Sequence, residues 1–159
     1  HKYAAGVTIK KKNFNSFKKS FEDAVKNNMQ EFNKFQILLY DTEIFFDEIN
    51  FKTYRIISQM GPFGISNLKP VFISKKCQEK TKTTLVGKNK EHLKLLIKDK
   101  KGKIMPGIAF NKSSYKDKIG GNVLFDILYT IDENSWNGEK FLQLIIKDFK
   151  INKPLTKKP

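Results

Sequence analysis

The sequence predicts an α+β protein whose C-terminal part is a small β-barrel. Apolar residues recur at helical spacing in the first 60 residues, whereas short segments of alternating polarity follow residue 70. Between them lies GPFGISNLKP, at 61–70, which holds two glycines and two prolines and therefore predicts a structured turn. Many short strands joined by turns are typical of β-sandwiches and barrels. We expect a mostly β domain preceded by a smaller α/β segment.

Two helices and two short strands are expected before residue 61. Residues 7–11 (VTIKK) alternate and predict a strand, and residues 36–40 (QILLY) predict a second, apolar one. From Asn13, an expected N-cap, apolar residues recur every three or four positions, which predicts core packing rather than base stacking for Phe14, Phe17, Phe21, Ala24, Val25, Met29 and Phe32. Residues 47–60 predict an amphipathic helix with inward positions at Ile49, Tyr54, Ile57 and Met60.

The alternating segments after residue 70 predict six strands, at 71–77, 83–86, 92–98, 103–110, 122–131 and 140–149. The pattern is clearest at 92–98, where Leu93, Leu95 and Ile97 share one face. Two hairpin turns are expected at 99–102 (DKKG) and 134–138 (NSWNG), and a long connection or short helix at 111–121. Five or six short strands with one longer connection near the third and fourth fit a five-stranded Greek-key barrel of the OB type. A β-sandwich is the alternative.

Charge is the strongest bulk property of the chain. There are 31 basic residues against 16 acidic ones, a formal net charge of +15, and Arg55 is the only arginine. Such an excess favours a polyanion, either nucleic acid or an anionic membrane surface, with a merely basic soluble surface as the alternative. No apolar run approaches the ~18 residues of a membrane span, so nucleic acid is the leading expectation. The single cysteine, Cys77, and two histidines exclude an internal disulfide and a Cys/His zinc cluster and fit a reducing cytoplasm.

Catalytic motifs are absent from this sequence. It contains no H-E-x-x-H pair, no nucleophile elbow, no P-loop and no Gly-rich dinucleotide turn. One compact acidic group lies where a helix is expected to begin, a position at which carboxylates favour the helix N-terminus: Asp41, Glu43, Asp47 and Glu48. The sequence therefore predicts binding rather than catalysis.

An OB barrel binds single strands through a basic groove and aromatic platforms. The phosphate-binding candidates for single-stranded DNA are Lys75, Lys76, Lys88, Lys90, His92, Lys94 and Lys98. The stacking candidates are Tyr115, in the long connection, and Trp136, in the last hairpin. Two of these residues have alternatives: Trp136 as a plug at the end of the barrel, and His92 as a hydrogen-bonded structural residue. The lysine run at 98–103 is expected to be a solvated turn.

Four stretches resemble a known family. HKYAAGVTI is similar to the end of the G-G-H-x-x-A-A-G motif of DHHA1 domains, and GPFGISNLKPVF, VGKNKEHLKLLI and NSWNGEKFLQLIIKDF resemble segments of RecJ-type single-strand-specific 5′→3′ exonucleases. They occur in the family's order and cover nearly the whole chain. The chain thus resembles the C-terminal part of such a nuclease, with the end of DHHA1 at 1–39, a connecting strand, helix and linker at 40–70, an OB domain at 71–152 and a disordered Lys/Pro-rich tail at 153–159.

The resemblance implies a bacterial, cytoplasmic enzyme of DNA repair and recombination. In the family, a separate lobe holds two Mn²⁺ or Mg²⁺ ions, the DHHA1 lobe grips the 5′ end, and the OB domain admits only single strands. Carried over, His1 and Gly6 would lie by the substrate phosphates, where Ala4 and Ala5 allow close approach. The motif's two leading glycines and the metal-binding aspartates are not in this sequence. The fragment is therefore expected to be inactive and to hold no metal or cofactor of its own.

The resemblance also makes GPFGISNLKP the connection that orients two domains. Positive φ is expected there at Gly64 and Asn67, and stiffness at Pro62 and Pro70. The alternative function is a protein-interaction module, in which the basic barrel holds the acidic tail of a single-strand-binding protein. A third possibility is a stand-alone OB protein such as a tRNA-binding domain, which would have no need of the HKYAAG lead-in.

Overall fold

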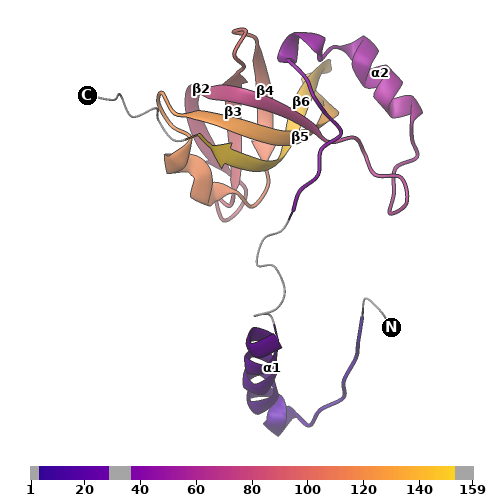
Figure 1. Ribbon diagram of the computed structural model, residues 1–159, viewed down its shortest axis with the longest axis vertical. Helices are drawn as coiled ribbons and strands as arrows, with labels where there is room; N and C mark the ends of the chain where they lie inside the picture. The colour runs from indigo at the N-terminus through magenta and orange to yellow at the C-terminus, as the bar shows by residue number, and fades with distance from the viewer. Residues whose placement is uncertain (1–3, 29–36, 153–159) are drawn as a thin grey trace. The chain divides into compact units, whose positions relative to one another are not determined.

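The structure is a computed structural model that describes residues 4–28 and 37–152 (Figure 1). The chain divides into two compact units, His1–Leu38 and Leu39–Pro159. The expected phosphate residue His1 and the tail at 153–159 lie outside the described residues.

The first unit contains a 3-10 turn, η1 (Lys11–Asn13), followed by helix α1 (Phe14–Asn28). The strand predicted at 7–11 is wrong, because a strand needs a partner and the described residues of this unit offer none. Asn13 is the last residue of η1, and its backbone N–H donates to the Lys10 carbonyl over 2.8 Å. Gly6 is exposed, with no other atom within 4 Å of the position that a Cβ would take.

The apolar stripe of α1 is not buried, so the predicted core packing is wrong for the described part of this helix. Phe14 and Phe21 are both more than half exposed, and the Phe17 and Phe21 rings stack with their centroids 5.8 Å apart. An apolar stripe becomes core only when a second element covers it, and the described residues of the unit supply none. Met29 and Phe32 of the predicted stripe lie outside the described residues.

Five strands of the second unit close into a barrel: β2 (Phe72–Val86), β3 (His92–Lys98), β4 (Ile104–Ala109), β5 (Leu124–Trp136) and β6 (Glu139–Ile151). Their order is β2-β3-β4-β6-β5, and β5 pairs back with β2. All neighbours are antiparallel except β4 and β6. The predicted five-stranded OB-type barrel is confirmed, and the sandwich alternative is not observed. A two-residue strand, β1 (Thr42–Glu43), adds to the start of β2 in parallel.

Strand β2 forms two sides of the barrel. Its first half pairs with β5 and its second half with β3, and register shifts occur between Ser74 and Cys77 and between Glu79 and Thr84. Bulges bend a strand and increase its twist, which lets one strand serve two neighbours. The two strands predicted at 71–77 and 83–86 are therefore one continuous strand, because the bulged residues between them hide the alternation.

The residues predicted to share one face of β3, Leu93, Leu95 and Ile97, are all buried in the core. Gly107 of β4 faces the same interior: a Cβ there would lie 3.0 Å from Ile146 Cδ1. The hydroxyl of buried Tyr129 hydrogen-bonds with Ser74 Oγ over 2.8 Å, and burial raises the pKa of this phenol.

The 3-10 turn η2 (Phe46–Glu48) and helix α2 (Phe51–Gln59) also contribute to the barrel core. Phe46 is fully buried and meets Tyr129 edge-on with the ring centroids 6.2 Å apart. The single helix predicted at 47–60 is interrupted because Asn50 caps α2, accepting the Thr53 N–H over 3.0 Å. Met60 is 54% exposed rather than inward, since it is the C-cap residue at the end of α2.

The strand predicted at 36–40 is wrong for its described part, because residues 37–40 are exposed and unpaired, and β1 begins only at Thr42. After α2, the turn at 61–70 is closed by mutual backbone hydrogen bonds between Gly64 and Asn67. Neither residue has positive φ, so that prediction is also wrong: the bridge forms with ordinary backbone angles. The connection from β4 to β5 carries η3 (Ser113–Lys118), which lies on a different side of the barrel from α2 (Figure 1).

Candidate nucleic-acid interface

The outward side chains of β3 and β4 form one surface, which we call the β3–β4 face. Lys94 pairs across the strands with Ile108, Leu96 with Pro106, and Lys98 with Ile104. Basic and apolar side chains therefore lie next to each other in successive rows. The face comprises His92, Lys94, Leu96, Lys98, Ile104, Pro106, Ile108 and Phe110.

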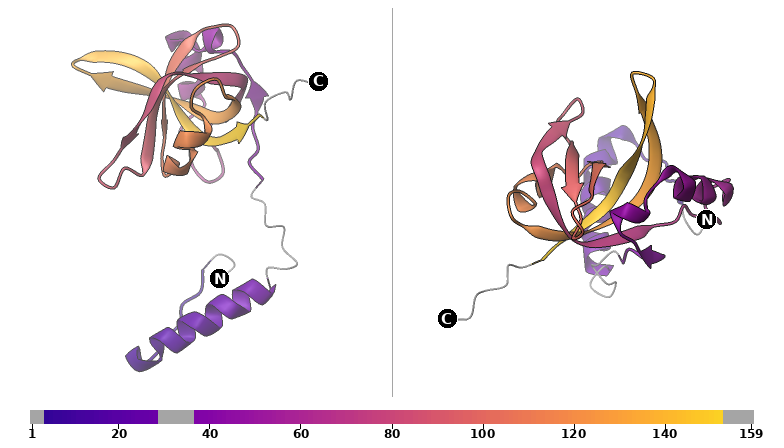
Figure 2. Two further views of the ribbon diagram at one scale, coloured as in Figure 1. Left: turned by 90° about the vertical axis from the view of Figure 1, so that its left-hand side faces the viewer. Right: turned by 90° about the horizontal axis from the view of Figure 1, so that it is seen from above.

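Two turns flank this face. The β2–β3 turn (residues 87–91) precedes His92, at one end of the face, and the β5–β6 hairpin turns at Asn137 and Gly138. Figure 2 shows both hairpins projecting on the same side of the barrel. In OB barrels, the corresponding strands and loops bind oligonucleotides and oligosaccharides.

The β2–β3 turn is a fixed structure that presents two exposed lysines, Lys88 and Lys90. Glu91 accepts the Asn89 N–H over 2.8 Å, and backbone hydrogen bonds lower the pKa of Glu91. Gly87 has φ +96°, and a Cβ there would lie 2.8 Å from the Glu91 carboxylate. Only glycine fits this position without strain. These contacts constrain the backbone of the turn that carries the two lysines.

His92 lies where the turn joins the face. Its Nδ1 accepts the Asn111 N–H over 3.1 Å, so the proton of the neutral ring is on Nε2, which lies 3.6 Å from Glu91 Oε1. The ring meets Phe110 edge-on with the centroids 5.0 Å apart. His92 therefore has the hydrogen-bonded structural role considered as an alternative, and it also supports an aromatic ring on the face.

Phe110 is the aromatic residue that sequence reasoning did not single out. Its side chain is 49% exposed directly after β4. The signal was present in the alternation, since Ile104, Pro106 and Ile108 share its parity and point outward.

The two predicted stacking residues occupy different surroundings. Trp136 is 74% exposed beside the β5–β6 turn, so it does not plug the barrel. Tyr115 lies on η3 with its ring centroid 5.1 Å from that of Phe149, and its hydroxyl donates to Asp148 over 3.3 Å. Lys112 and Lys118 lie 5.5 and 5.2 Å from the centroid of the Tyr115 ring. The structure does not bring Tyr115 to the β3–β4 face.

Lys75 and Lys76 belong to the half of β2 that pairs with β5, away from β3. The Lys75 amine contacts Glu43 over 2.7 Å, and this hydrogen bond raises the pKa of Lys75. The backbone N–H of Lys76 donates to the Asp126 carboxylate over 3.0 Å. The structure therefore separates these two lysines from the other predicted phosphate contacts.

The other four predicted phosphate-binding lysines have no carboxylate partner among the described residues. Within the described part of the chain, no carboxylate lies within 4 Å of the amines of Lys88, Lys90, Lys94 or Lys98. In the lysine run at 98–103, by contrast, Lys101 is paired with Asp47 over 2.9 Å and covers the Phe45 ring. The β3–β4 face and its turn therefore combine the exposed ring of Phe110 with four lysines that form no ion pair among the described residues.

The barrel matches a family of known proteins. A family model described as the RecJ OB domain matches residues 40–148, which is most of the chain and includes the whole β3–β4 face. The chain belongs to the RecJ OB domain family.

Curated RecJ proteins match nearly all of this chain. It is 26% identical over 149 residues to the "Single-stranded-DNA-specific exonuclease RecJ" of Bacillus subtilis (strain 168), covering 93% of this chain and 19% of the relative. It is 28% identical over 150 residues to the protein of the same name in Haemophilus influenzae, covering 92% of this chain and 25% of the relative. The chain therefore spans only about a fifth to a quarter of the length of these relatives.

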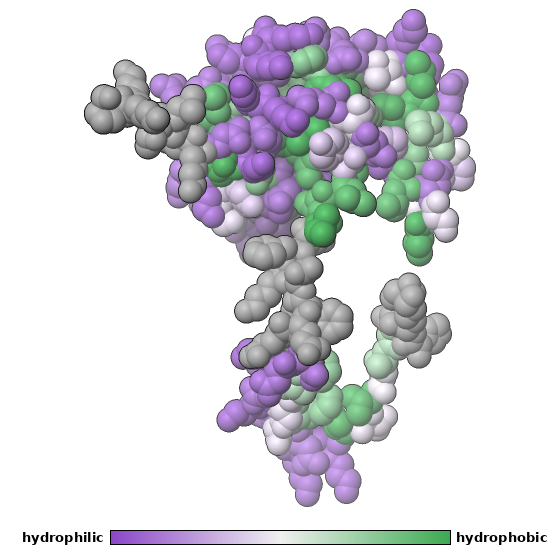
Figure 3. All heavy atoms as spheres, in the orientation of Figure 1, coloured by the Kyte–Doolittle hydropathy of each residue, from purple (hydrophilic) through white to green (hydrophobic). Residues whose placement is uncertain are grey.

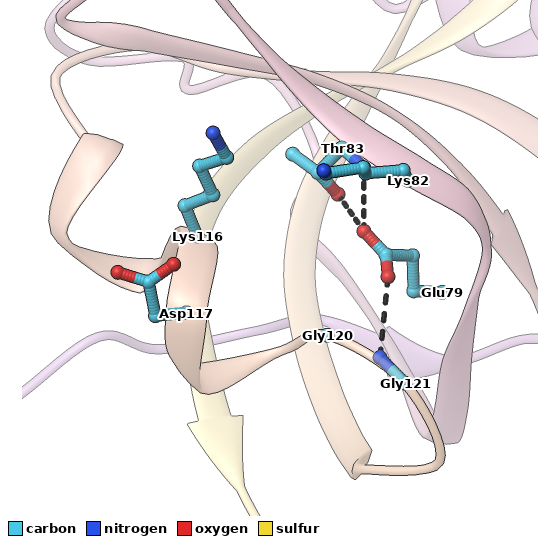
Figure 4. A pocket seen from close by; sticks show the side chains of 7 residues that line it. All are labelled: Glu79, Lys82, Thr83, Lys116, Asp117, Gly120 and Gly121. Carbon is cyan, nitrogen blue, oxygen red and sulfur yellow. Dashed lines mark hydrogen bonds between the residues drawn. The ribbon is translucent and has the colours of Figure 1, made fainter.

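This RecJ OB domain also has a pocket of about 320 Å³ between β2 and the η3 connection (Figure 4). Glu79 joins its two walls by accepting hydrogen bonds from the N–H and hydroxyl of Thr83 and from the Gly121 N–H. Two lysines line it, Lys82 and Lys116, but so do the carboxylates of Glu79 and Asp117. The pocket is therefore balanced in charge, unlike the β3–β4 face.

No group of three or more His, Cys, Asp or Glu side chains suited to a metal ion occurs among residues 4–28 and 37–152. Burial raises the pKa of the free Cys77 thiol to about 12, so this thiol is not a nucleophile at neutral pH. Across the same residues, no helix has the length and apolar character needed to cross a membrane.

Proposed function

We propose that this chain binds single-stranded DNA along the β3–β4 face as the substrate-selecting part of a RecJ-type 5′→3′ exonuclease, acting in DNA repair and recombination in the bacterial cytoplasm. The observation that carries the proposal is the set of unpaired lysines around an exposed aromatic ring, between two projecting turns. The names of the relatives, which describe exonucleases specific for single-stranded DNA, support it.

The β3–β4 face and the two turns beside it offer both contacts that a single strand needs. Lys88, Lys90, Lys94 and Lys98 attract phosphates, and Phe110 and Trp136 present ring faces or edges to bases. Seven residues of β3 correspond to about 20 Å of strand, enough for several nucleotides. A duplex hides its base faces within the stack, so stacking contacts select for single strands.

Hydrolysis is assigned to the part of the longer protein outside this chain. The Mn²⁺ or Mg²⁺ ions of the family do not fit the described residues, which bring no suitable ligand cluster together. The chain alone is expected to bind DNA without cutting it.

Fluorescence anisotropy with a labelled oligothymidine at several salt concentrations tests the proposal. The double substitution Lys94→Ala/Lys98→Ala is expected to weaken binding about tenfold. It should also make the negative slope of log K against log salt shallower by about 1.4, since each phosphate contact on a single strand contributes about 0.7. The matched control is Lys52→Ala/Lys150→Ala, which removes two exposed lysines from α2 and β6.

Two results would contradict the proposal. One is an equal affinity for blunt duplex and single strand. The other is an effect of the control pair as large as that of the β3–β4 face pair, which would reduce binding to a general attraction by the +15 charge.

The acidic tail of a single-strand-binding protein is the second candidate ligand. It is favoured by exposed apolar side chains, Leu96 and Ile104, that lie between the lysines of the face. Titration with an acidic peptide, followed by competition with oligothymidine, separates the two. Tight peptide binding with no binding of the oligonucleotide would assign the face to a protein ligand.

A further inference from the structure

The turn after α2 exposes two aliphatic side chains almost completely. Ile65 is 99% exposed and Leu68 is 76% exposed. Single apolar residues on a surface are ordinary, but a contiguous apolar patch marks an interaction site. What distinguishes this turn is that hydrogen bonds close it.

Four hydrogen bonds hold the turn. Gly64 and Asn67 exchange backbone bonds of 2.8 and 3.1 Å, and the Asn67 side-chain amide donates to the carbonyls of Met60 and Pro62 over 2.9 and 3.0 Å. On the inner side, Phe63 packs against the barrel core. The two aliphatic side chains are therefore held away from the barrel by a fixed backbone.

The exposed apolar surface continues onto α2. Ile56 and Met60 lie one helical turn apart, and each is more than half exposed. The Asn67 hydrogen bond to Met60 makes the turn and this helix face neighbours. Figure 3 shows apolar spheres along the side of the barrel unit that carries α2 and the turn. We call Ile56, Met60, Ile65 and Leu68 the α2 patch.

The surroundings of the patch argue against nucleic acid as its ligand. Between Arg55 and Lys69 there is no charged residue, which is the longest uncharged run in a sequence that is 30% charged. A polyanion gains nothing from such a surface, whereas a protein surface of similar apolar character does. The curated relatives are four to five times longer than the region matched, so a longer protein has ample chain to cover the patch.

We propose that the α2 patch docks into an apolar surface on the remainder of the longer RecJ-type polypeptide, so that Ile65 and Leu68 are exposed here but buried there. This inference rests on membership of the family and not on the proposed DNA binding. It assigns a contact role to the turn itself, beyond that of a linker.

The test compares one substitution pair in two contexts. In the present chain, Ile65→Ser/Leu68→Ser should leave the melting midpoint unchanged within about 2 °C, because both side chains are already in water. In the longer protein, the same pair should accelerate release of the barrel unit by limited proteolysis about a hundredfold, because two buried aliphatic contacts are lost. The control pair Ile65→Val/Leu68→Met keeps the surface apolar and should release the unit at the wild-type rate. Ile65→Ser alone provides a milder variant should the pair fail to fold.

Three results would overturn the proposal. The first is equal release rates for the serine pair and the wild type in the longer protein. The second is a dimer of the present chain by analytical ultracentrifugation that the serine pair converts to a monomer, which would make a second copy the occupant. The third is loss of oligothymidine binding by the serine pair, which would place nucleic acid on the patch. Failure of the Lys94→Ala/Lys98→Ala test would leave this inference untouched.

Discussion

At the scale of single residues, His92 contacts the Phe110 ring on the β3–β4 face while that ring stays partly exposed to solvent. The His92 ring is fixed by a hydrogen bond from the Asn111 backbone, and it contacts Phe110 edge-on. Phe110 therefore keeps its orientation while almost half of its side chain stays in water. An aromatic ring held in this way loses little conformational freedom when a base stacks on it.

This arrangement predicts that Phe110→Leu weakens oligonucleotide binding about tenfold, because stacking on one aromatic residue contributes about 1–3 kcal/mol per base. Leucine keeps the apolar character of the site but has no ring. Placing 2-aminopurine at successive positions of the oligonucleotide would detect the change, since its quenching should be lost at one position only. Unchanged quenching at every position, in a variant that melts like the wild type, would exclude Phe110 as a platform.

At the scale of elements, Asp99 joins the β3–β4 turn to η2. Its buried carboxylate accepts the N–H of Phe46 over 3.0 Å, that of Lys101 over 3.0 Å and that of Lys103 over 2.9 Å. A single side chain thus shapes the hairpin turn and also anchors the segment that inserts Phe46 into the core.

Asp99→Ala should lower the free energy of unfolding by about 3 kcal/mol, since it leaves buried donors without an acceptor. Urea denaturation measures this loss. Asp117→Ala, which removes an exposed carboxylate from η3, is the matched control and should change stability by less than about 0.5 kcal/mol. Equal stability of the two variants would show that Asp99 does not hold the elements together.

The elements also show which parts of the fold are readable from sequence. Strand β3 spans the predicted residues 92–98 because its alternation is uninterrupted and both of its edges are paired. The strand predicted at 7–11 fails for the opposite reason, since pairing depends on residues elsewhere. Among site residues, Lys94 and Lys98 follow from parity on β3. The position of Lys75 depends on which neighbour β2 pairs with, and the bulges that decide this leave no local pattern.

At the scale of the whole molecule, the barrel unit contains its own core. Among the residues that the structure describes, the buried apolar ones all lie between Phe46 and Phe149, whereas no residue of α1 is buried. The lysines also differ in whether they form ion pairs. Several lysines of the barrel unit pair with nearby carboxylates, whereas those of the β3–β4 face form no ion pair among the described residues.

A chain reduced to residues 39–159 should therefore melt within about 2 °C of the full chain, because the stabilising contacts of the barrel come from that range. Differential scanning calorimetry of both forms gives the comparison. A drop of more than about 5 °C would mean that the first unit contributes directly to barrel stability.

The hydrogen bonds of Asp99 have a mechanical consequence. Lys98, at the end of the β3–β4 face, is the covalent neighbour of Asp99. The Asp99 carboxylate accepts a hydrogen bond from the Phe46 N–H, in the segment that leads into α2. Under the proposed function, tension in a strand bound at Lys98 would reach η2, and the helix that bears the α2 patch, through the Asp99 carboxylate.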